Sequence, residues 1–376
     1  MVVARTRAEA EDTAACVAIQ RLELPVVADK KGALAPGTPP IHRQLTDNLA
    51  FRKIDTGDIE AVFARADRVI EGTFEFARHT AVRLEPRCVL ADYEEATGKL
   101  TITTSSQCPH RIQRVFAATL GVPDHKVQII APDVGSFGLK IHTYGDELAT
   151  CAAMRLGRPV KLVADRLEAF VSDIHTRENF VRARIAVSKA GDIEAFDVDV
   201  LSGAGAYAQY PRTSVLEGTQ ILNITGGPYK HKHYRGRASI VYLNEPPSSQ
   251  YRAAGHPIGN ALREHLVDRA AAALGIDAVE IVARNVIPDE GYPAIAPSGV
   301  TLKGLSHARC LDVLVERVGY SELRAEQARL RERSVHRGVG IACFIKGTAP
   351  GAARSRSRMH ASSGSSPMAA CCVRWA

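Results

Sequence analysis

The centre of the chain alternates apolar and polar residues in the way that antiparallel strands do. Two alternating runs, 179–188 and 193–203, flank a Lys-Ala-Gly-Asp turn and predict a β-hairpin. The same period, or a short apolar run between turn residues, predicts further strands at 68–77, 88–94, 100–106, 126–132, 159–165, 233–244 and 338–346. The pattern therefore makes β-sheet a main component of the fold.

Apolar residues recur at helical spacing elsewhere. Ile59 and Phe63 do so within 57–67, and Leu262 and Leu266 belong to an amphipathic stretch at 258–274. Helices are also predicted at 6–18, 109–120, from about Tyr144, and at 276–285, 307–320 and 320–333, with Ser306 as an N-cap. Because hairpins and helices mix without steady strand–helix alternation, we expect an α+β protein.

The first 28 residues are predicted to be a separate fragment. A strand at 1–4, a helix at 6–18 and a strand at 19–29 make part of an α/β unit whose partner strands would lie upstream. A connector rich in proline and glycine follows. We therefore expect an incomplete unit at 1–28 and a linker at 29–48.

The last 28 residues differ in kind from the rest. Residues 349–376 have no periodicity and no acidic residue, and they contain the only Trp. Such a composition is typical of a disordered tail. Its position just after the strand predicted at 338–346 also fits a shift of reading frame. We expect 349–376 to be a disordered or out-of-frame tail.

The net charge of +7 comes entirely from this end of the chain. The seven Lys and Arg residues after Glu332 account for it, so the first 332 residues are neutral on balance. A nucleic-acid surface needs basic residues on the folded body, and we therefore expect no nucleic-acid partner. No apolar run approaches the roughly 20 residues that cross a bilayer, and the N-terminus lacks the apolar centre of a signal peptide. We expect a cytoplasmic protein with no membrane association.

A loop of small residues follows the strand predicted at 126–132. It reads Gly135-Ser136-Phe137-Gly138 and places an aromatic ring between small residues. Glycines at a strand end indicate a positive φ or the close approach of a ligand to the backbone. On local grounds, an ordinary tight turn with Phe137 in the core is the alternative.

Four stretches, taken in order, resemble the large, molybdenum-cofactor-binding subunit of the xanthine dehydrogenase/aldehyde oxidase family. They are RHTAVRLEPRCVLADYE (78–94), TTSSQCPH (103–110), PDVGSFGLK (132–140) with GRPVKLVADRLE (157–168), and SSQYRAAGHPIGNALREHLVDRAAAALGIDAVEIVARNVIP (248–288). The resemblance is strongest to carbon monoxide dehydrogenase-like (form II) bacterial members and runs from residue 2 to about 349.

The resemblance implies a domain organisation. Residues 1–28 would be the remnant of an N-terminal α/β hammerhead domain, and 49–305 the first molybdenum-cofactor-binding α+β domain. A second such domain would start at 306–348 and be largely missing. The family's general base, a glutamate, belongs to that second domain. The resemblance therefore implies a chain truncated at both ends that is inactive alone.

The resemblance also assigns site residues. Gln107 would donate its amide to a molybdenum oxo group, which a neutral amide does without a charge cost. The loop around Phe137 would lie against the metal and the pterin, and Arg252 would steady negative charge near the metal. The implied cofactor-binding residues are Gln107, Gly135, Ser136, Phe137, Gly138, Arg252, Ala253 and Ala254, with Gln107 and Arg252 as catalytic residues.

Other matched positions carry weaker implications. Ala253 stands where carbon monoxide-oxidising members have a cysteine, which argues against carbon monoxide oxidation by that route. His256 could contact substrate, although a histidine at a helix start is more often structural. Glu85 and Arg87 are interpreted as an architectural pair. Glu264 and Asp268 would lie on the polar side of a scaffold helix.

The implied cofactor is a molybdenum–pterin dinucleotide of the cytosine type. The substrate would be a small molecule, such as an aldehyde or an N-heterocycle, hydroxylated with oxygen derived from water. The eight cysteines lack Cys-x-x-Cys spacing, so this chain is not expected to ligate iron–sulfur clusters itself. FAD and [2Fe–2S] clusters are expected on a medium and a small partner subunit.

Two other functions remain open at this point. The chain could be a non-catalytic scaffold fragment that keeps the fold in order to associate with the flavin and iron–sulfur subunits. It could also be a NAD-linked oxidoreductase, since Gly-Ala-Gly-Ala at 203–206 resembles half of a dinucleotide fingerprint. That motif lacks a third glycine and lies late in a predicted strand, which argues against the NAD reading.

Overall fold

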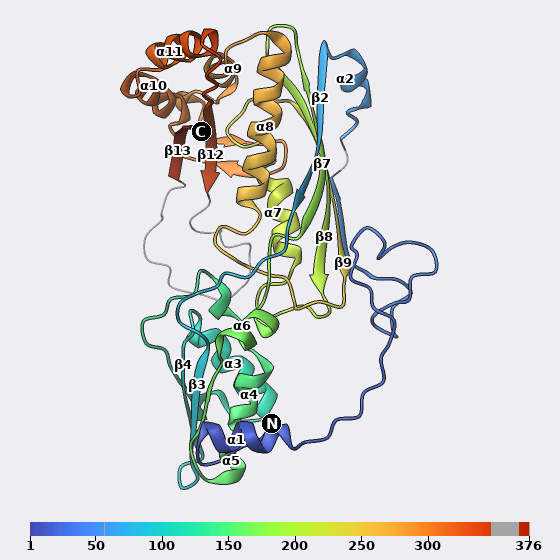
Figure 1. The fold of residues 1–376 in the computed structure, drawn as a ribbon, viewed down its shortest axis with the longest axis vertical. Helices are drawn as coiled ribbons and strands as arrows, with labels where there is room; N and C mark the ends of the chain where they lie inside the picture. Colours follow the sequence, from blue (N-terminus) through green and yellow to red (C-terminus); the bar gives the residue numbers. More distant parts are fainter. Residues whose placement is uncertain (56, 347–367, 376) are drawn as a thin grey trace.

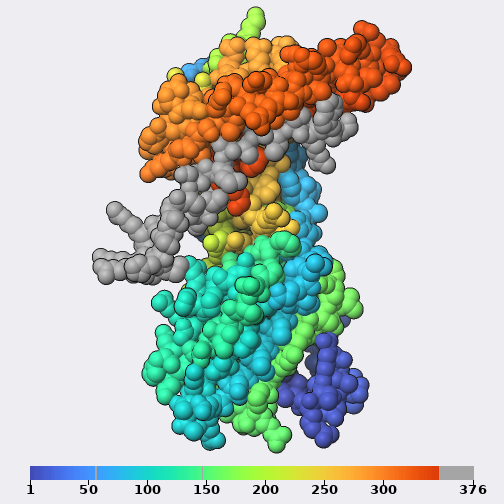
Figure 2. All heavy atoms as spheres, turned by 90° about the vertical axis from the view of Figure 1, so that its left-hand side faces the viewer, coloured from blue at the N-terminus to red at the C-terminus, as the bar shows by residue number. Residues whose placement is uncertain are grey.

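The computed structural model describes residues 1–55, 57–346 and 368–375 and has two lobes along its long axis (Figure 1). The upper lobe in that view contains a five-stranded sheet and the lower lobe a four-stranded sheet. Figure 2 shows the same two lobes in side view with a narrower middle. Both sheets combine parallel and antiparallel pairs with helices, which confirms the predicted α+β class.

The five-stranded sheet carries the larger core. Its strand order is β1 (Leu49–Asp55), β9 (His233–Tyr242), β8 (Ile193–Gly205), β7 (Asn179–Val187) and β2 (Arg68–Phe76). The predicted hairpin is β7–β8. On one face pack α7 (Val215–Thr225), α8 (His256–Leu274) and α9 (Ala278–Asn285), and α2 (Glu60–Arg65) lies over part of the other. Alternation along the strands explains this, because inward residues such as Phe196 and Ile240 meet Leu266 of α8 in one buried cluster.

The four-stranded sheet has its own core. Its order is β5 (Val127–Ile130), β4 (Lys99–Thr104), β3 (Cys88–Glu94) and β6 (Val160–Val163). Around it lie α3 (Pro109–Leu120), α4 (Gly145–Ala149), α5 (Ala153–Leu156) and α6 (Arg166–Ser172). Leu100, Ile102 and Phe116 are fully buried between the sheet and α3. This lobe therefore folds around a core of its own.

The lower lobe is inserted between two neighbouring strands of the upper sheet. The chain leaves the upper sheet after β2 and returns to it at β7, which is hydrogen-bonded to β2. The outgoing and returning segments pair through His79 and Thr176, whose backbone amides and carbonyls bond in both directions at 3.1 and 3.0 Å. These two segments, 77–87 and 173–178, form the junction between the lobes.

Asp173 stabilises this junction from within. Its carboxylate accepts hydrogen bonds from Arg83 and from Arg87 Nε, the latter at 2.8 Å. All three side chains are about 1% exposed. Arg87 also donates to Ser172 Oγ at 2.9 Å and lies over the ring of Tyr144. Charges so far from water need close partners, and here each arginine has one.

The N-terminal segment corrects two predicted strands. The predicted helix forms as α1 (Arg7–Ala15), capped by Thr6 Oγ1, which accepts from Glu9 N at 3.2 Å. The segments 1–4 and 19–29 contain no strand. A strand needs a hydrogen-bonded neighbour, and no described segment pairs with these two. Alternation alone was therefore insufficient to predict them.

The C-terminal elements extend beyond those predicted. The helices α10 (His307–Arg317) and α11 (Tyr320–Glu332) and the strand β12 (Val339–Lys346) form where expected. Residues 349–367 of the predicted tail lie outside the described residues. Residues 368–375 form β13 (Met368–Trp375), antiparallel to β12, which the prediction of a disordered tail did not include. Ser306 occupies the N-cap position of α10, but its side chain makes no capping hydrogen bond.

Strand β12 is attached to α8 by a buried pair of side chains. Arg263 is fully buried and donates to the carbonyl of Cys343, while Glu264 accepts from the amide of Cys343 at 2.8 Å. Tyr229 donates to the same carboxylate at 3.0 Å. The prediction that Glu264 lies on the polar side of α8 is therefore wrong, because it satisfies a strand edge and a buried phenol instead. No helix among the described residues is long and apolar enough to cross a membrane.

The Gly-Ala-Gly-Ala segment has a packing role. Gly205 has φ +72°, and a Cβ there would lie 2.2 Å from the carbonyl oxygen of Pro246. We expect Gly205→Ala to lower the free energy of unfolding by about 2–4 kcal/mol, because the strained φ and the overlap add. Chemical denaturation would measure this. Gly145→Ala, which meets no atom within 4 Å, should change stability by less than about 0.5 kcal/mol, and equal effects of the two would contradict the assignment.

Candidate cofactor-binding site

Three segments that are distant in sequence meet at the junction between the lobes. Gln107 and the loop around Phe137 come from the lower lobe, and Arg252 belongs to the loop that leads into α8 of the upper lobe. The amide of Arg252 donates to the carbonyl of Phe137 at 2.8 Å, and the amide of Gln107 donates to the carbonyl of Lys140 at 2.8 Å. The candidate site residues therefore form one continuous surface.

Ser136 fixes the orientation of the Gln107 side chain. Its hydroxyl donates to Gln107 Oε1 and accepts from the amides of Gly138 and Lys140 at 3.2 and 3.1 Å. Ser136 is buried, whereas Gln107 is exposed. Since Oε1 faces Ser136, the Nε2 donors of Gln107 face away from the loop. Nε2 has no partner among the described residues, so it is available to an acceptor outside the protein.

Phe137 lies at the surface, not in the core. Its ring is 49% exposed, and its backbone has φ +54°, an uncommon value for a residue with a side chain. The ring meets Tyr251 edge to face, with centroids 6.3 Å apart. Gly138 follows with φ +105°, and a Cβ there would lie 3.3 Å from Gln250 Cγ. The loop therefore holds an exposed aromatic ring above a backbone in which only glycine fits at 138.

Glu85 holds this loop from below. Its carboxylate accepts from the amide of Gly135 at 3.1 Å and pairs with Lys140 Nζ at 3.0 Å. Burial raises the pKa of Glu85, but the bonds from Lys140 and Gly135 outweigh it and leave the pKa below its usual value. Glu85 does not pair with Arg87, whose partner is Asp173. The two residues are thus separate braces and not the pair that the sequence suggested.

The Arg252 loop has an unusual backbone. Ala253 has φ +70° and Ala254 has φ +45°. Left-handed conformations in two successive alanines are strained and need outside support. Arg177 supplies it, since its guanidinium donates to the carbonyl of Arg252 at 2.5 Å and to the carbonyl of Ala254.

Glu217 on α7 in turn fixes Arg177. Its buried carboxylate pairs with Arg177 Nη1 at 2.5 Å and accepts from the backbone amide of Arg177 at 2.8 Å. Thr176 Oγ1 and Asn179 Nδ2 also donate to it, at 3.0 and 3.2 Å. Sequence reasoning missed this network, because its members are 38 to 41 residues apart and form no short motif.

Histidines near the site are neutral by burial. Burial lowers the pKa of His142 to about 4, and its two ring nitrogens lie 3.1 Å from the carbonyl of Tyr210 and 3.2 Å from Ser249 Oγ. Burial also lowers the pKa of His256, whose Nδ1 lies 2.8 Å from the carbonyl of Ala253. His256 thus closes the end of the Arg252 loop at the first residue of α8.

The donors of this surface fit a molybdenum pterin. Gln107 Nε2 and the guanidinium of exposed Arg252 have no partner among the described residues, and the nearby carboxylate of Glu85 is matched by Lys140. Unpaired donors suit the oxo and phosphate oxygens of an anionic cofactor. The exposed ring of Phe137 and the backbone at Gly138 give such a group an apolar wall that it can approach closely.

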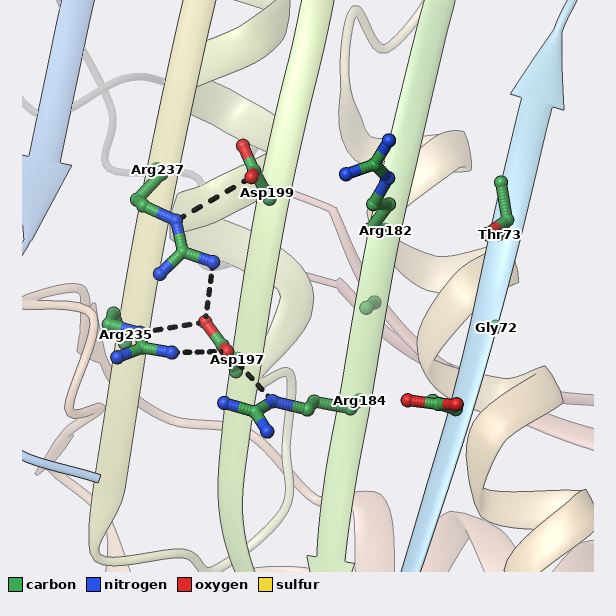
Figure 3. A pocket seen from close by; sticks show the side chains of 10 residues that line it. Gly72, Thr73, Arg182, Arg184, Asp197, Asp199, Arg235 and Arg237 are labelled. Carbon is green, nitrogen blue, oxygen red and sulfur yellow. Dashed lines mark hydrogen bonds and ion pairs between the residues drawn. The ribbon is translucent and has the colours of Figure 1, made fainter. Parts of the chain in front are cut away.

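A larger groove lies elsewhere and contains none of the predicted site residues. It measures about 630 Å³ and lies on the open face of the five-stranded sheet (Figure 3). There Asp197 accepts from Arg184 at 2.9 Å and from Arg235 at 2.7 Å, and Arg237 lies between Asp197 and Asp199. The charges that face this groove largely compensate one another.

Comparison with known proteins gives a consistent result. The family described as molybdopterin cofactor-binding domain matches residues 41–286. The nicotine 6-hydroxylase large subunit of Paenarthrobacter nicotinovorans is 31% identical over 354 residues, which cover 92% of this chain and 42% of the relative. The carbon monoxide dehydrogenase large chain of Afipia carboxidovorans is 29% identical over 369 residues, covering 92% and 46%.

The fold matches solved structures of the same kind. Quinoline 2-oxidoreductase from Pseudomonas putida 86 superposes with a TM-score of 0.87 at 30% identity, over 91% of this chain and 44% of that one. Carbon monoxide dehydrogenase from Oligotropha carboxidovorans superposes with a TM-score of 0.84 at 27% identity, over 90% and 45%. The chain spans less than half the length of these relatives.

Proposed function

Since the chain belongs to the molybdopterin cofactor-binding domain family of xanthine dehydrogenase-type and carbon monoxide dehydrogenase-type large subunits, we propose that it forms one wall of a molybdenum hydroxylase active site. The observation that carries the proposal is the direct bond between the carbonyl of Phe137 and the amide of Arg252, with Gln107 fixed beside them by Ser136. That bond joins an aromatic wall and a cationic side chain from different lobes.

Each residue has a distinct role in the proposed site. Gln107 offers two amide hydrogens to an oxygen ligand of the cofactor, because Ser136 occupies its own oxygen. Arg252 places a permanent positive charge beside the same position, which stabilises negative charge that develops there. Phe137 excludes water from one side of the cofactor. The cofactor, when bound, supplies the two-electron oxidation that inserts an oxygen atom from water into a substrate carbon.

The cofactor and partners are proposed in more detail by analogy with the relatives. The pterin is a dinucleotide of the cytosine type, and electrons leave through [2Fe–2S] and FAD centres on separate subunits. The large-subunit names of several relatives support the subunit arrangement. The substrate is a small molecule, either an aldehyde or an N-heterocycle. Turnover needs a second cofactor-binding domain, so the present chain binds cofactor without hydroxylating substrate.

Cofactor content tests the proposal. The chain, purified from a host that makes molybdenum cofactor, should retain molybdenum and pterin. Gly138→Ala should lower the molybdenum content at least about fivefold, because a Cβ at 138 moves the cofactor-facing loop. Gly121→Ala is the matched control, since Gly121 also has a positive φ but meets no atom within 4 Å.

Three outcomes are informative. Equal molybdenum in the two glycine variants would contradict the placement of the cofactor. A wild-type chain that captures flavin and iron–sulfur subunits without any molybdenum would favour the alternative, a non-catalytic scaffold. Turnover of an aldehyde or an N-heterocycle by the isolated chain would disprove its proposed inactivity.

A further inference from the structure

Arg212 is a shielded arginine without a carboxylate partner. Each buried arginine among the described residues contacts an acid, since Arg83 and Arg87 share Asp173, Arg177 pairs with Glu217 and Arg263 with Glu264. Half-buried Arg212 contacts none of the described carboxylates. A guanidinium removed from water without an anion is unfavourable, and that cost is relieved when an anion binds.

The guanidinium of Arg212 is held at the edge of the candidate site. Its Nη1 donates to Gln250 Oε1, and the side chain of Gln250 packs over Gly138 of the site loop. The backbone of Arg212 is also anchored, because Ser249 Oγ donates to its carbonyl at 2.6 Å. The side chain is therefore positioned beside Gly138 by two neighbours that are themselves ordered.

A second unpaired cation faces Arg212. Arg111 lies in the first turn of α3, four residues after Gln107, is exposed and has no acidic partner among the described residues. Burial and, next, the positive charge of Arg111 lower the pKa of Arg212, so the two guanidinium groups lie within electrostatic range. Like charges this close repel unless an anion lies between them.

The remaining neighbours carry no negative charge. Cys108 lies within the field of both arginines, and burial raises the pKa of its thiol, so it is protonated at neutral pH. His142 is neutral, with a pKa of about 4. Arg111 and Arg212 therefore form an uncompensated positive pair that borders the Gln107–Phe137 surface.

We propose that Arg111 and Arg212 bind the carboxylate of an anionic organic substrate and so orient its ring or carbonyl toward Gln107. This inference rests on the proposed function, because it places the substrate beside that same site. Two guanidinium groups from different elements, α3 and the 206–214 loop, provide planar donors for one carboxylate. The site would select small acids over neutral compounds of the same shape.

A phosphate of the cofactor is the other source of a negative charge at this position. Carboxylate and pyrophosphate both match guanidinium donors. They differ in what they accompany, since a carboxylate would belong to a freely exchanging substrate and pyrophosphate to the resident cofactor. Separate probes can distinguish them.

The test uses the cofactor-free full chain and isothermal titration calorimetry. Benzoate should bind, and benzamide, its uncharged analogue, should bind at least about tenfold more weakly. Arg212→Gln and Arg111→Gln should each raise the Kd for benzoate about tenfold. Arg158→Gln is the matched control, because Arg158 is exposed beyond α5 at the far end of the same lobe and should leave the Kd unchanged.

The outcomes separate this inference from the cofactor proposal. Since Arg111 is exposed on a helix surface, its variant should fold even if Arg212→Gln does not. Benzoate binding that is absent, or equally weakened by Arg158→Gln, would overturn the inference while leaving molybdenum retention untouched. Pyrophosphate that binds more tightly than benzoate, and that loses more affinity in both variants, would reassign the pair to the cofactor and overturn the substrate role.

Discussion

Asp173→Asn is expected to lower the free energy of unfolding by about 3–5 kcal/mol, the cost of removing one partner from a buried charge cluster. The amide leaves Arg83 and Arg87 positively charged, about 1% exposed and without their carboxylate. Because these residues join the segments that leave and re-enter the upper sheet, we expect both lobes to be affected. Urea denaturation followed by circular dichroism would measure the change.

An exposed acid on the same lobe provides the control. Asp92→Asn removes the same charge from the surface of β3 and should change stability by less than about 0.5 kcal/mol. A similar, small effect at both positions would mean that the buried cluster does not support the junction.

Arg177→Met is expected to cost about 3–5 kcal/mol for the same physical reason, with an additional effect on the site. It leaves the buried carboxylate of Glu217 without its cation, and it removes donors from the carbonyls of Arg252 and Ala254. The Arg252 loop should then relax from its left-handed conformation. We therefore expect lower molybdenum retention as well as lower stability.

A double-mutant cycle separates the two effects. In Arg177→Met combined with Glu217→Gln, no unpaired charge remains buried, so part of the stability should return while molybdenum retention stays low. Arg182→Met on β7 is the matched control, because Arg182 is exposed and forms no ion pair with a described residue. Full additivity of the two substitutions would contradict a direct Arg177–Glu217 pair.

Local periodicity predicted most of the sheet and the long helices. The β7–β8 hairpin and α8 carry strong repeats of two and of about 3.6 residues, and both form where predicted. Three elements were missed, namely β1, α6 and α7. The α7 segment is apolar on most sides because it is buried between α8 and the sheet, so it shows little amphipathic contrast.

The candidate site could be predicted only in part. The resemblance identified Gln107, Phe137 and Arg252, which the structure brings into contact through two backbone bonds and Ser136. It did not identify Arg177, Glu217 or Asp173. Their roles depend on the insertion of one lobe between β2 and β7, which places residues 40 to 90 positions apart in contact. Such long-range pairing leaves no pattern in a single sequence.

Hydrogen–deuterium exchange of the chain with and without bound molybdenum pterin tests the central claim most directly. We predict that the cofactor slows exchange in three separate segments, at residues 105–108, 135–140 and 250–255, with little change on the open face of the five-stranded sheet. Protection confined to that face, or to only one of the three segments while molybdenum is bound, would contradict a shared site at the junction of the lobes.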